Sequence, residues 1–394
     1  MQVSSKRVAA VDAPIIPTIA RLVREHPGTL SLGQGVVNHG PPSEAVARLS
    51  DLLSDSQLHK YQSVFGLPEF LASLEKKLAT DNGIAITPEN QVMVTAGSNM
   101  AFLNATLVVS EPGDEIILPR PFFFNQEMAI RLCGCVPVTV PTKSDWQLDV
   151  DVIKSALTKR TRAVVTVSPN NPTGAVYDEA SLTAVNRLCA EHGIYHFSDE
   201  AYESFTFDQT SHFSPASLPG AGAHTFSFFS LSKNYGMASW RVGYAVFPVA
   251  LTEAMSKVQD TNLICPPVIS QLLANEVLKY GEPWLQPKRE ALAAVRQNVH
   301  EMLGTLPGLI EFPRTTGAFY VLMRLPALAA DQTAMDFIRF MVDRHRVITI
   351  PGFPFGLNDP TQGNYQRLSF GSLDADSVSQ GVSRFLEAVR QWYA

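Results

Sequence analysis

The chain is poor in the residues that would hold together a small secreted domain. Its 394 residues contain only four cysteines, which are too few for a framework of disulfides. Cys133 and Cys135 lie close together, but their short segment lacks the second pair of ligands that a zinc site requires. We therefore expect buried thiols in a reducing compartment, and a cytoplasmic protein.

Long hydrophobic runs and an excess of positive charge are also missing. No apolar stretch approaches the roughly 18 residues of a membrane span. The first residues include Lys6 and Arg7 and lack the apolar core of a signal peptide. The formal net charge is -6, which gives no electrostatic basis for binding nucleic acid or an anionic membrane. A small molecule is therefore the expected partner.

What the sequence does contain is a regular succession of short apolar runs with amphipathic stretches between them. Runs of this kind are typical of a mostly parallel sheet that helices cover on both faces. Only a short turn fits between the last two runs, so we expect the last strand to be antiparallel to its predecessor. The seven predicted strands are 91–95, 115–118, 136–140, 162–167, 194–198, 225–229 and 241–247.

The pattern changes beyond about residue 283. A long amphipathic helix is predicted over 288–303, followed by mixed strands and helices. Because the chain is too long for one ordinary core, we predict an α/β protein with two domains. A large domain over 36–283 holds the seven-stranded sheet, and 284–394 forms a smaller α+β domain. Residues 1–35 have no strand and helix pattern of their own and are expected to pack with the small domain.

Polar motifs follow the predicted strands, at the positions where open α/β sheets bind ligands. Asp199 closes one strand, and a carboxylate at such a place is costly to bury without a cationic partner. Lys233 ends the sequence Ser-Leu-Ser-Lys, and Arg241 follows eight residues later. Tyr202 and Asn171 add a phenol and an amide. Together these groups are what a protein needs to hold an aldehyde cofactor as a Schiff base and to tune its ring.

Two of the motifs also have plain structural interpretations. Gly97, Ser98 and Asn99 end a strand and open an apolar helix, where backbone N–H groups and hydroxyls can bind a phosphate. An ordinary helix cap by Ser98 explains the same sequence equally well. Asn171 stands in Asn-Asn-Pro-Thr-Gly, whose composition also suits a simple turn. Taken alone, neither motif decides the function.

Taken together, the motifs resemble the pyridoxal 5'-phosphate-dependent aminotransferases of fold type I, class I/II. The resemblance runs from about residue 32 to 370 and rests on the order Asn-Pro-Thr-Gly, Asp-x-x-Tyr and Ser-x-Ser-Lys with a later Arg. It implies the fold type I architecture and pyridoxal 5'-phosphate as the cofactor. It also implies a ping-pong reaction that passes the α-amino group of an amino acid to a 2-oxo acid.

The resemblance implies roles for single residues in holding the cofactor. Lys233 matches the Schiff-base lysine that also moves the α-proton, and Asp199 matches the partner of the pyridine nitrogen. Asn171 and Tyr202 match the ligands of the phenolate oxygen, and Tyr202 belongs with Lys233 and Asp199 to the implied catalytic group. Phe123 matches the aromatic residue that stacks on the ring. The residues that resemble the phosphate ligands are Gly97, Ser98, Asn99, Ser230 and Arg241.

Three further positions concern the substrate and the assembly. Arg367 matches the arginine that binds the substrate α-carboxylate, a task suited to a fork of N–H donors, and Asn171 is expected beside it. Gly35 is expected at the substrate end of the pocket. Tyr61 matches a tyrosine that reaches the phosphate of the neighbouring subunit, so the resemblance implies a homodimer with shared active sites and no metal.

The sequence departs from relatives that prefer aspartate. Those relatives often carry a second arginine about seven residues before a Pro-Pro pair, whereas here Asp260 precedes Pro266 and Pro267 and no arginine occurs in the run. A second substrate carboxylate near Asp260 is unfavourable because like charges repel. Ser-Leu-Gly-Gln-Gly at 31–35 looks more like the kynurenine, glutamine and methionine aminotransferase branch. We therefore expect an aromatic or neutral amino acid.

Two other functions compete with this interpretation. A C–S β-lyase of the same fold would use the same lysine and ring partners, because these residues serve any reaction through a carbanion at Cα. A non-catalytic regulator would need a DNA-binding helix-turn-helix, and the roughly 35 residues before the first motif are too few for one. The aminotransferase is the first hypothesis and the β-lyase the alternative.

Overall fold

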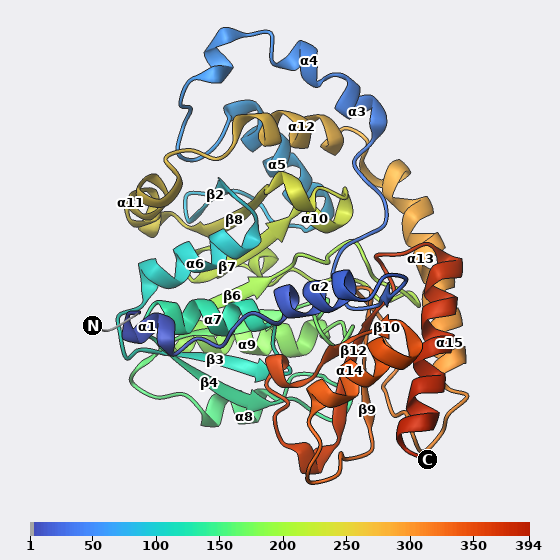
Figure 1. The fold of residues 1–394 in the computed structure, drawn as a ribbon. Coiled ribbons are helices and arrows are strands. Elements are labelled where there is room, and N and C mark those ends of the chain that lie inside the picture. Colours follow the sequence, from blue (N-terminus) through green and yellow to red (C-terminus); the bar gives the residue numbers. More distant parts are fainter. Residues whose placement is uncertain (1–3) are drawn as a thin grey trace.

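The computed structural model describes residues 4–394 and is built around a seven-stranded sheet (Figure 1). The strand order is β2-β8-β7-β6-β5-β3-β4. Strands β7 to β4 run parallel, and β8 is antiparallel to both of its neighbours, which confirms the predicted reversal of the last strand. The bounds are β2 (Asn90–Thr95), β3 (Glu115–Arg120), β4 (Val136–Pro141), β5 (Thr161–Val167), β6 (Tyr195–Asp199), β7 (Thr225–Ser230) and β8 (Gly243–Pro248).

Helices cover both faces of the sheet because successive side chains of each strand point to opposite faces. Along β2, Met93 joins the hydrophobic cluster on one face, while Val92 and Val94 join the cluster on the other. The first face carries α6 (Ser98–Val109), α7 (Phe124–Leu132) and α11 (Thr252–Leu263). The second face carries α5 (Pro68–Asp81), α8 (Val150–Ser155), α9 (Glu179–His192) and α12 (Val268–Leu278). The predicted α/β class is confirmed.

The C-terminal part has its own small antiparallel sheet, with the order β11-β12-β9. Its bounds are β9 (Tyr320–Leu325), β11 (Ile350–Pro351) and β12 (Asn364–Ser369). Three helices pack against it and against one another: α13 (Gly281–Leu303), α14 (Ala334–His345) and α15 (Ala375–Trp392). Within residues 4–394, we find no helix with the length and apolarity that a membrane span requires.

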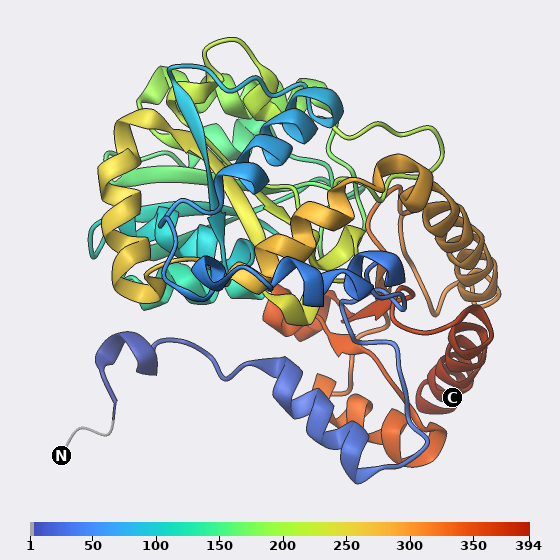
Figure 2. The ribbon, with the colours of Figure 1, turned by 90° about the horizontal axis from the view of Figure 1, so that it is seen from above.

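The N-terminal segment runs along both parts of the molecule: α1 (Lys6–Ala9) contacts α7 beside the large sheet, whereas α2 (Ile15–Glu25) and β1 (Leu30–Ser31) lie beside the C-terminal part (Figure 1 and Figure 2). Strand β1 pairs in parallel with β10 (Val347–Ile348). The buried side chains of α2 belong to the same hydrophobic cluster as those of α14 and α15. The division of the chain into domains at residues 35 and 283 stays a prediction.

Two predicted elements differ from the observed ones. The strand expected from residue 241 begins at Gly243, because Arg241 adopts a left-handed backbone with φ 51° at the end of a short turn. The helix expected from residue 288 begins at Gly281 and continues through Pro287. A proline removes one N–H from the helix ladder and usually ends a helix, which is why the sequence alone indicates a later start.

Candidate active site

Most of the predicted site residues line one cavity of about 240 Å³ at the carboxyl ends of the strands. The predicted residues in its wall are Gly35, Ser98, Asn99, Phe123, Asn171, Asp199, Tyr202, Ser230, Lys233, Arg241 and Arg367. Gly97 lies just behind the wall, against Arg241. Tyr61 does not line the cavity of its own chain, and its side chain is 79% exposed. Its predicted contact with a neighbouring subunit stays a prediction.

Lys233 lies on α10 (Leu231–Asn234), directly after β7. The hydroxyl of Ser230 caps this short helix by accepting a hydrogen bond from the N–H of Ser232 over 3.2 Å. The Nζ atom of Lys233 donates to the carbonyl of Gly35. Burial, with a smaller contribution from nearby arginines, lowers the pKa of Lys233 to about 8. A larger share of the amine is therefore neutral and nucleophilic near pH 7.

Asp199 is the last residue of β6 and is buried at the bottom of the cavity. Its Oδ1 accepts from the N–H of Ala201 over 3.2 Å, and its Oδ2 accepts from Nε2 of Gln126 over 2.7 Å. Burial raises the pKa of Asp199 to about 6. A cation placed against this carboxylate would offset the cost of burial. Gln126 lies on α7, and nothing in the sequence singles it out.

Tyr202 shares a hydroxyl pair with Tyr320, the first residue of β9. The two hydroxyl oxygens lie 2.7 Å apart, and Nδ2 of Asn171 donates to the Tyr202 hydroxyl over 3.4 Å. A Cβ atom on Gly35 would meet the Tyr320 hydroxyl at 2.5 Å, so only glycine fits there. The sequence predicts Tyr202, Asn171 and Gly35, but an aromatic residue at the start of a strand looks like core, and Tyr320 is not distinguished from it.

Arg367 projects from β12 and is buried, with 2% of its surface exposed. Its Nη1 donates to Oδ1 of Asn171 over 2.8 Å, and its Nη2 donates to the carbonyl of Gly33 over 2.6 Å. The guanidinium lies 4.5 Å from the ring centre of Tyr320 and 5.1 Å from that of Phe355. Its Nε is buried without a partner among residues 4–394. A buried cation with a free N–H is suited to a carboxylate ligand.

The other end of the cavity is built around the start of α6. Gly97 occupies the cap position with φ 88°, and no side chain caps the helix, so the interpretation of Ser98 as an ordinary cap is wrong. Arg241 lies so near that a Cβ on Gly97 would meet its Nη2 at 2.5 Å. The guanidinium is held by Nη1, which donates to the carbonyl of Ala238 over 2.9 Å. Free N–H groups, an arginine and the nearby serine hydroxyls suit a phosphate.

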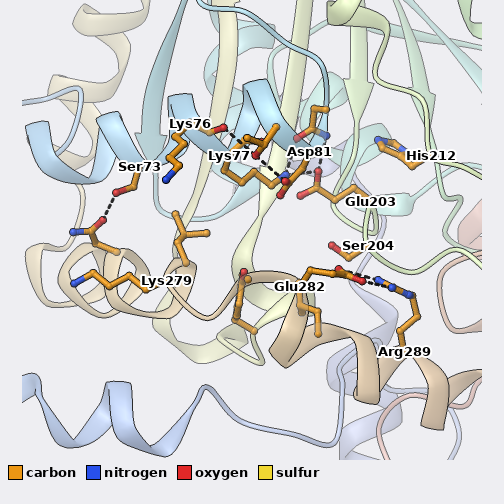
Figure 3. Close-up of a pocket in the computed structure, with 17 residues that line it drawn as sticks. Ser73, Lys76, Lys77, Asp81, Glu203, Ser204, His212, Lys279, Glu282 and Arg289 are labelled. Atoms are coloured by element: carbon orange, nitrogen blue, oxygen red, sulfur yellow. Dashed lines mark hydrogen bonds and ion pairs between the residues drawn. The ribbon is translucent and has the colours of Figure 1, made fainter.

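A larger hollow of about 590 Å³ lies between α5, α12 and the start of α13 (Figure 3). None of the predicted site residues lines it. Much of its charge is paired internally, since Lys77 donates to Glu203 over 2.5 Å and Arg289 pairs with Glu282. The predicted site residues therefore lie together in the smaller cavity and not in this hollow.

Comparison with known proteins agrees with this geometry. Residues 27–385 match the family described as aminotransferase class I and II. The aromatic aminotransferase ISS1 of Arabidopsis thaliana is 33% identical over 395 residues, covering 98% of this chain and 96% of that protein. The probable aspartate/prephenate aminotransferase of Aquifex aeolicus is 31% identical over 338 residues, covering 84% of each. The aromatic aminotransferase structure from Pyrococcus horikoshii OT3 superimposes with a TM-score of 0.84 at 30% identity, covering 95% of this chain and 99% of that one.

The chain therefore belongs to the class I and II aminotransferases. It is a transaminase, and its cofactor is pyridoxal 5'-phosphate, as the sequence predicts. The residues present fit this cofactor on three independent observations. Asp199 is a buried carboxylate that lacks a full cationic partner, Gly97 leaves room for Arg241 at a helix start, and Lys233 is a partly buried amine with a lowered pKa.

Proposed function

We propose that the protein transfers the α-amino group of an aromatic or neutral amino acid to a 2-oxo acid. The observation that carries the proposal is the charge of the cavity wall. Among residues 4–394, the charged side chains that line it are Asp199, Lys233, Arg241 and Arg367. Arg241 lies at the phosphate end and Arg367 is suited to the α-carboxylate, so no cation remains in this chain for a second carboxylate.

The rest of the substrate end supports the same choice. The apolar side chains that line the cavity include Ile16, Val36 and Phe124. Apolar surface of this kind binds an aromatic or aliphatic side chain by the hydrophobic effect. Asp260 is exposed on α11 and does not line the cavity of its own chain. The names of the aromatic aminotransferases from Arabidopsis thaliana and Pyrococcus horikoshii support the proposal.

Each catalytic side chain has a task that its position supports. Bound pyridoxal 5'-phosphate supplies an aldehyde that accepts an amine and a ring that draws electrons away from Cα. Asp199 would keep the ring nitrogen of the bound cofactor protonated, because an ionised carboxylate in a buried place stabilises an adjacent cation. Lys233 Nζ would take up the proton that leaves the substrate Cα and would release it again when the product forms. Arg367 holds the substrate carboxylate in a fixed orientation.

The substrate class can be tested by the first half of the reaction alone. A panel of amino acids is mixed with the holoenzyme, and the loss of the visible cofactor band is followed in single turnover. We expect phenylalanine, tyrosine or methionine to react faster than aspartate. Aspartate as the fastest donor would contradict the proposal. Release of pyruvate and ammonia from a cysteine conjugate, without an added oxo acid, would favour the β-lyase instead.

A pair of variants tests the apolar end directly. Ile16→Ala removes a side chain that lines the cavity, and we expect a lower kcat/KM for aromatic donors by roughly 10-fold, within the usual range for a few methylene groups. Ile86→Ala is the matched control, because Ile86 is also partly buried against a hydrophobic cluster but lies outside the cavity. An equal loss in both variants would show a general effect on folding and not one on specificity.

We also propose that two copies of the chain form a dimer in which Tyr61 serves the neighbouring site. The exposed phenol of Tyr61 and the exposed Ile264 and Ile269, at 45% and 42% exposure, support such a contact. Tyr61→Ala and Lys233→Ala should each be inactive, and a mixed dimer of the two should regain one complete site. A lack of activity after mixing and refolding, with dimers present in sedimentation, would contradict the shared site.

Two further expectations, on the protein's location and on nucleic acid, rest on the sequence alone. The cytoplasmic location and the absence of a nucleic-acid partner stay predictions, based on the thiols and on the net charge of -6. A gel-shift titration at low salt checks the second of these.

A further inference from the structure

A second cavity, of about 570 Å³, lies where the edge of the large sheet meets the C-terminal sheet. One wall is formed by Arg120 at the end of β3 and by the loop that follows β4. The other wall is formed by Phe312, Tyr365 and the loop before β12. The cavity shares no lining residue with the active-site cavity. It is therefore a separate place in which a ligand could contact both parts of the chain.

Two residues that line this cavity carry buried N–H donors without acceptors. Nε of Arg120 and Nε1 of Trp146 are both buried and have no hydrogen-bond partner among residues 4–394. The guanidinium of Arg120 makes no ion pair in the described part of the chain. Native proteins leave few such donors unsatisfied, so each needs an explanation. An ionised carboxylate only accepts hydrogen bonds, and in the cavity it would balance the charge of Arg120.

The charges around the cavity leave an excess of positive charge. Arg324 pairs with Glu311 over 2.8 Å. Asp359 accepts hydrogen bonds from its own loop, which lower its pKa and keep it ionised. Lys143 is exposed at the rim and, like Arg120, has no ion pair among residues 4–394. The cavity wall therefore carries three cations and two carboxylates, a net excess of one positive charge that favours an anion.

The wall beside these cations is aromatic. Trp146 has a left-handed backbone with φ 65°, and its backbone N–H donates to the carbonyl of Lys143 over 3.0 Å. A tryptophan rarely adopts this conformation without a cost. Its ring meets that of Tyr365 edge to face, with centroids 6.3 Å apart. Phe312 and Leu357 extend the apolar surface. A flat or apolar group attached to the anion would pack here.

We propose that this cavity is a second binding site, which takes a small aromatic carboxylate and acts on the active site through Arg367. Tyr365 and Arg367 are two residues apart on β12, so their side chains stand on the same face of the strand. Phe355 contacts the Arg367 guanidinium and precedes Gly356, which lines the second cavity. A ligand that packs against Tyr365 and Gly356 would therefore contact the strand and the segment that hold Arg367 in place.

The test uses the holoenzyme and 3-phenylpropanoate, an aromatic carboxylate with neither an amino nor a keto group. Calorimetric titration of the wild-type protein should show two classes of site, because the probe also fits the active site. Arg120→Gln should weaken one class by at least tenfold, as expected when charge-assisted hydrogen bonds are lost. Arg187→Gln is the matched control, since Arg187 is exposed, has no ion pair in residues 4–394 and lies outside the cavity. It should leave both classes unchanged.

Further variants separate this site from the proposed function. Arg367→Gln should weaken binding of the probe at the active site. It should leave the affinity of the second site, which depends on Arg120, unchanged, and this result does not depend on which amino acid is the substrate. Lys143→Gln, at an exposed position, serves if Arg120→Gln fails to fold. Trp146→Gly removes the ring at a left-handed position that glycine accepts, and it should abolish binding of the aromatic probe at this class. Identical isotherms for the wild type and Arg120→Gln, or equally tight binding of inorganic phosphate, would overturn the proposal.

Discussion

A hydrogen bond of 2.8 Å joins the Arg367 guanidinium to the side-chain carbonyl of Asn171, although 196 residues separate them in the chain. The amide nitrogen of Asn171 points the other way and donates to the hydroxyl of Tyr202. One amide therefore fixes both the cation suited to the substrate and a phenol that faces the cofactor site. The small sheet and the large sheet meet at this contact, which explains why both must be in place for the site to exist.

The first prediction concerns the fork of donors on Arg367. Arg367→Lys keeps the positive charge, but a lysine ammonium lacks the planar set of N–H donors that lets the guanidinium bind Asn171 and a carboxylate at the same time. We expect KM to rise roughly 10- to 100-fold for the amino donor and for the oxo-acid acceptor alike, since both carry the same carboxylate. Steady-state kinetics with each substrate varied in turn measures this. Arg339→Lys, on the surface pair with Asp336, is the control and should change neither value.

The second prediction concerns the close approach of Gly35 and Tyr320. A Cβ at position 35 would lie 2.5 Å from the Tyr320 hydroxyl but 3.6 Å from the ring carbon that bears it. Gly35→Ala should therefore displace Tyr320 and lower activity. Tyr320→Phe removes the clashing oxygen, so the double variant should be more active than Gly35→Ala alone. A double variant that is worse than both single ones would contradict this geometry.

The third prediction concerns the pH dependence of stability in the cofactor-free protein. Burial raises the pKa of Asp199 to about 6, above the value of about 3.9 in an unfolded chain. Between these values the folded state binds more protons, so the contribution of Asp199 to the free energy of unfolding falls as pH rises from about 4 to about 6. The difference between the folded and unfolded pKa values corresponds to about 3 kcal/mol in the free energy of unfolding. Urea unfolding of the wild type and of Asp199→Asn, compared at each pH, isolates it.

Asp208 provides a control of opposite sign. Hydrogen bonds from Arg314 and Arg296 lower its pKa well below the usual range. Its contribution to stability is therefore present above about pH 4 and is lost as the pH falls below that value. Comparing Asp208→Asn with the wild type should show a stability difference that shrinks on acidification. If the Asp199 variant followed the same trend, the assignment of Asp199 as a buried and poorly paired carboxylate would be wrong.

The sequence predicts the parts of the site that lie in short motifs after strands. Asp199, Lys233 and Asn171 are of this kind, because strand ends in a parallel sheet meet at one edge whatever the details of packing. The sheet itself follows from the apolar runs, and the reversal of β8 follows from the short turn before it. These features depend on local pattern and on general rules of topology, which one sequence is enough to apply.

Other residues of the site depend on contacts between distant segments. Tyr320 reaches the cavity and Gln126 reaches Asp199 only because β9 and α7 pack where they do, and Ile16 reaches the cavity on α2 from the N-terminal segment. An isolated Tyr, Gln or Ile has no local pattern that separates a site residue from a core residue. The start of α6 is a further example. Whether Gly97 or Ser98 caps the helix depends on the backbone angle of Gly97, which the sequence does not reveal.

The central claim is that the amine of Lys233 carries the cofactor. Borohydride treatment of the holoenzyme, followed by digestion and mass spectrometry, tests it most directly. We expect a cofactor-derived mass increase on the peptide that contains Lys233, and no labelled peptide in Lys233→Ala. A label on another lysine, such as Lys76 or Lys77 in the larger hollow, with Lys233 unmodified, would contradict it.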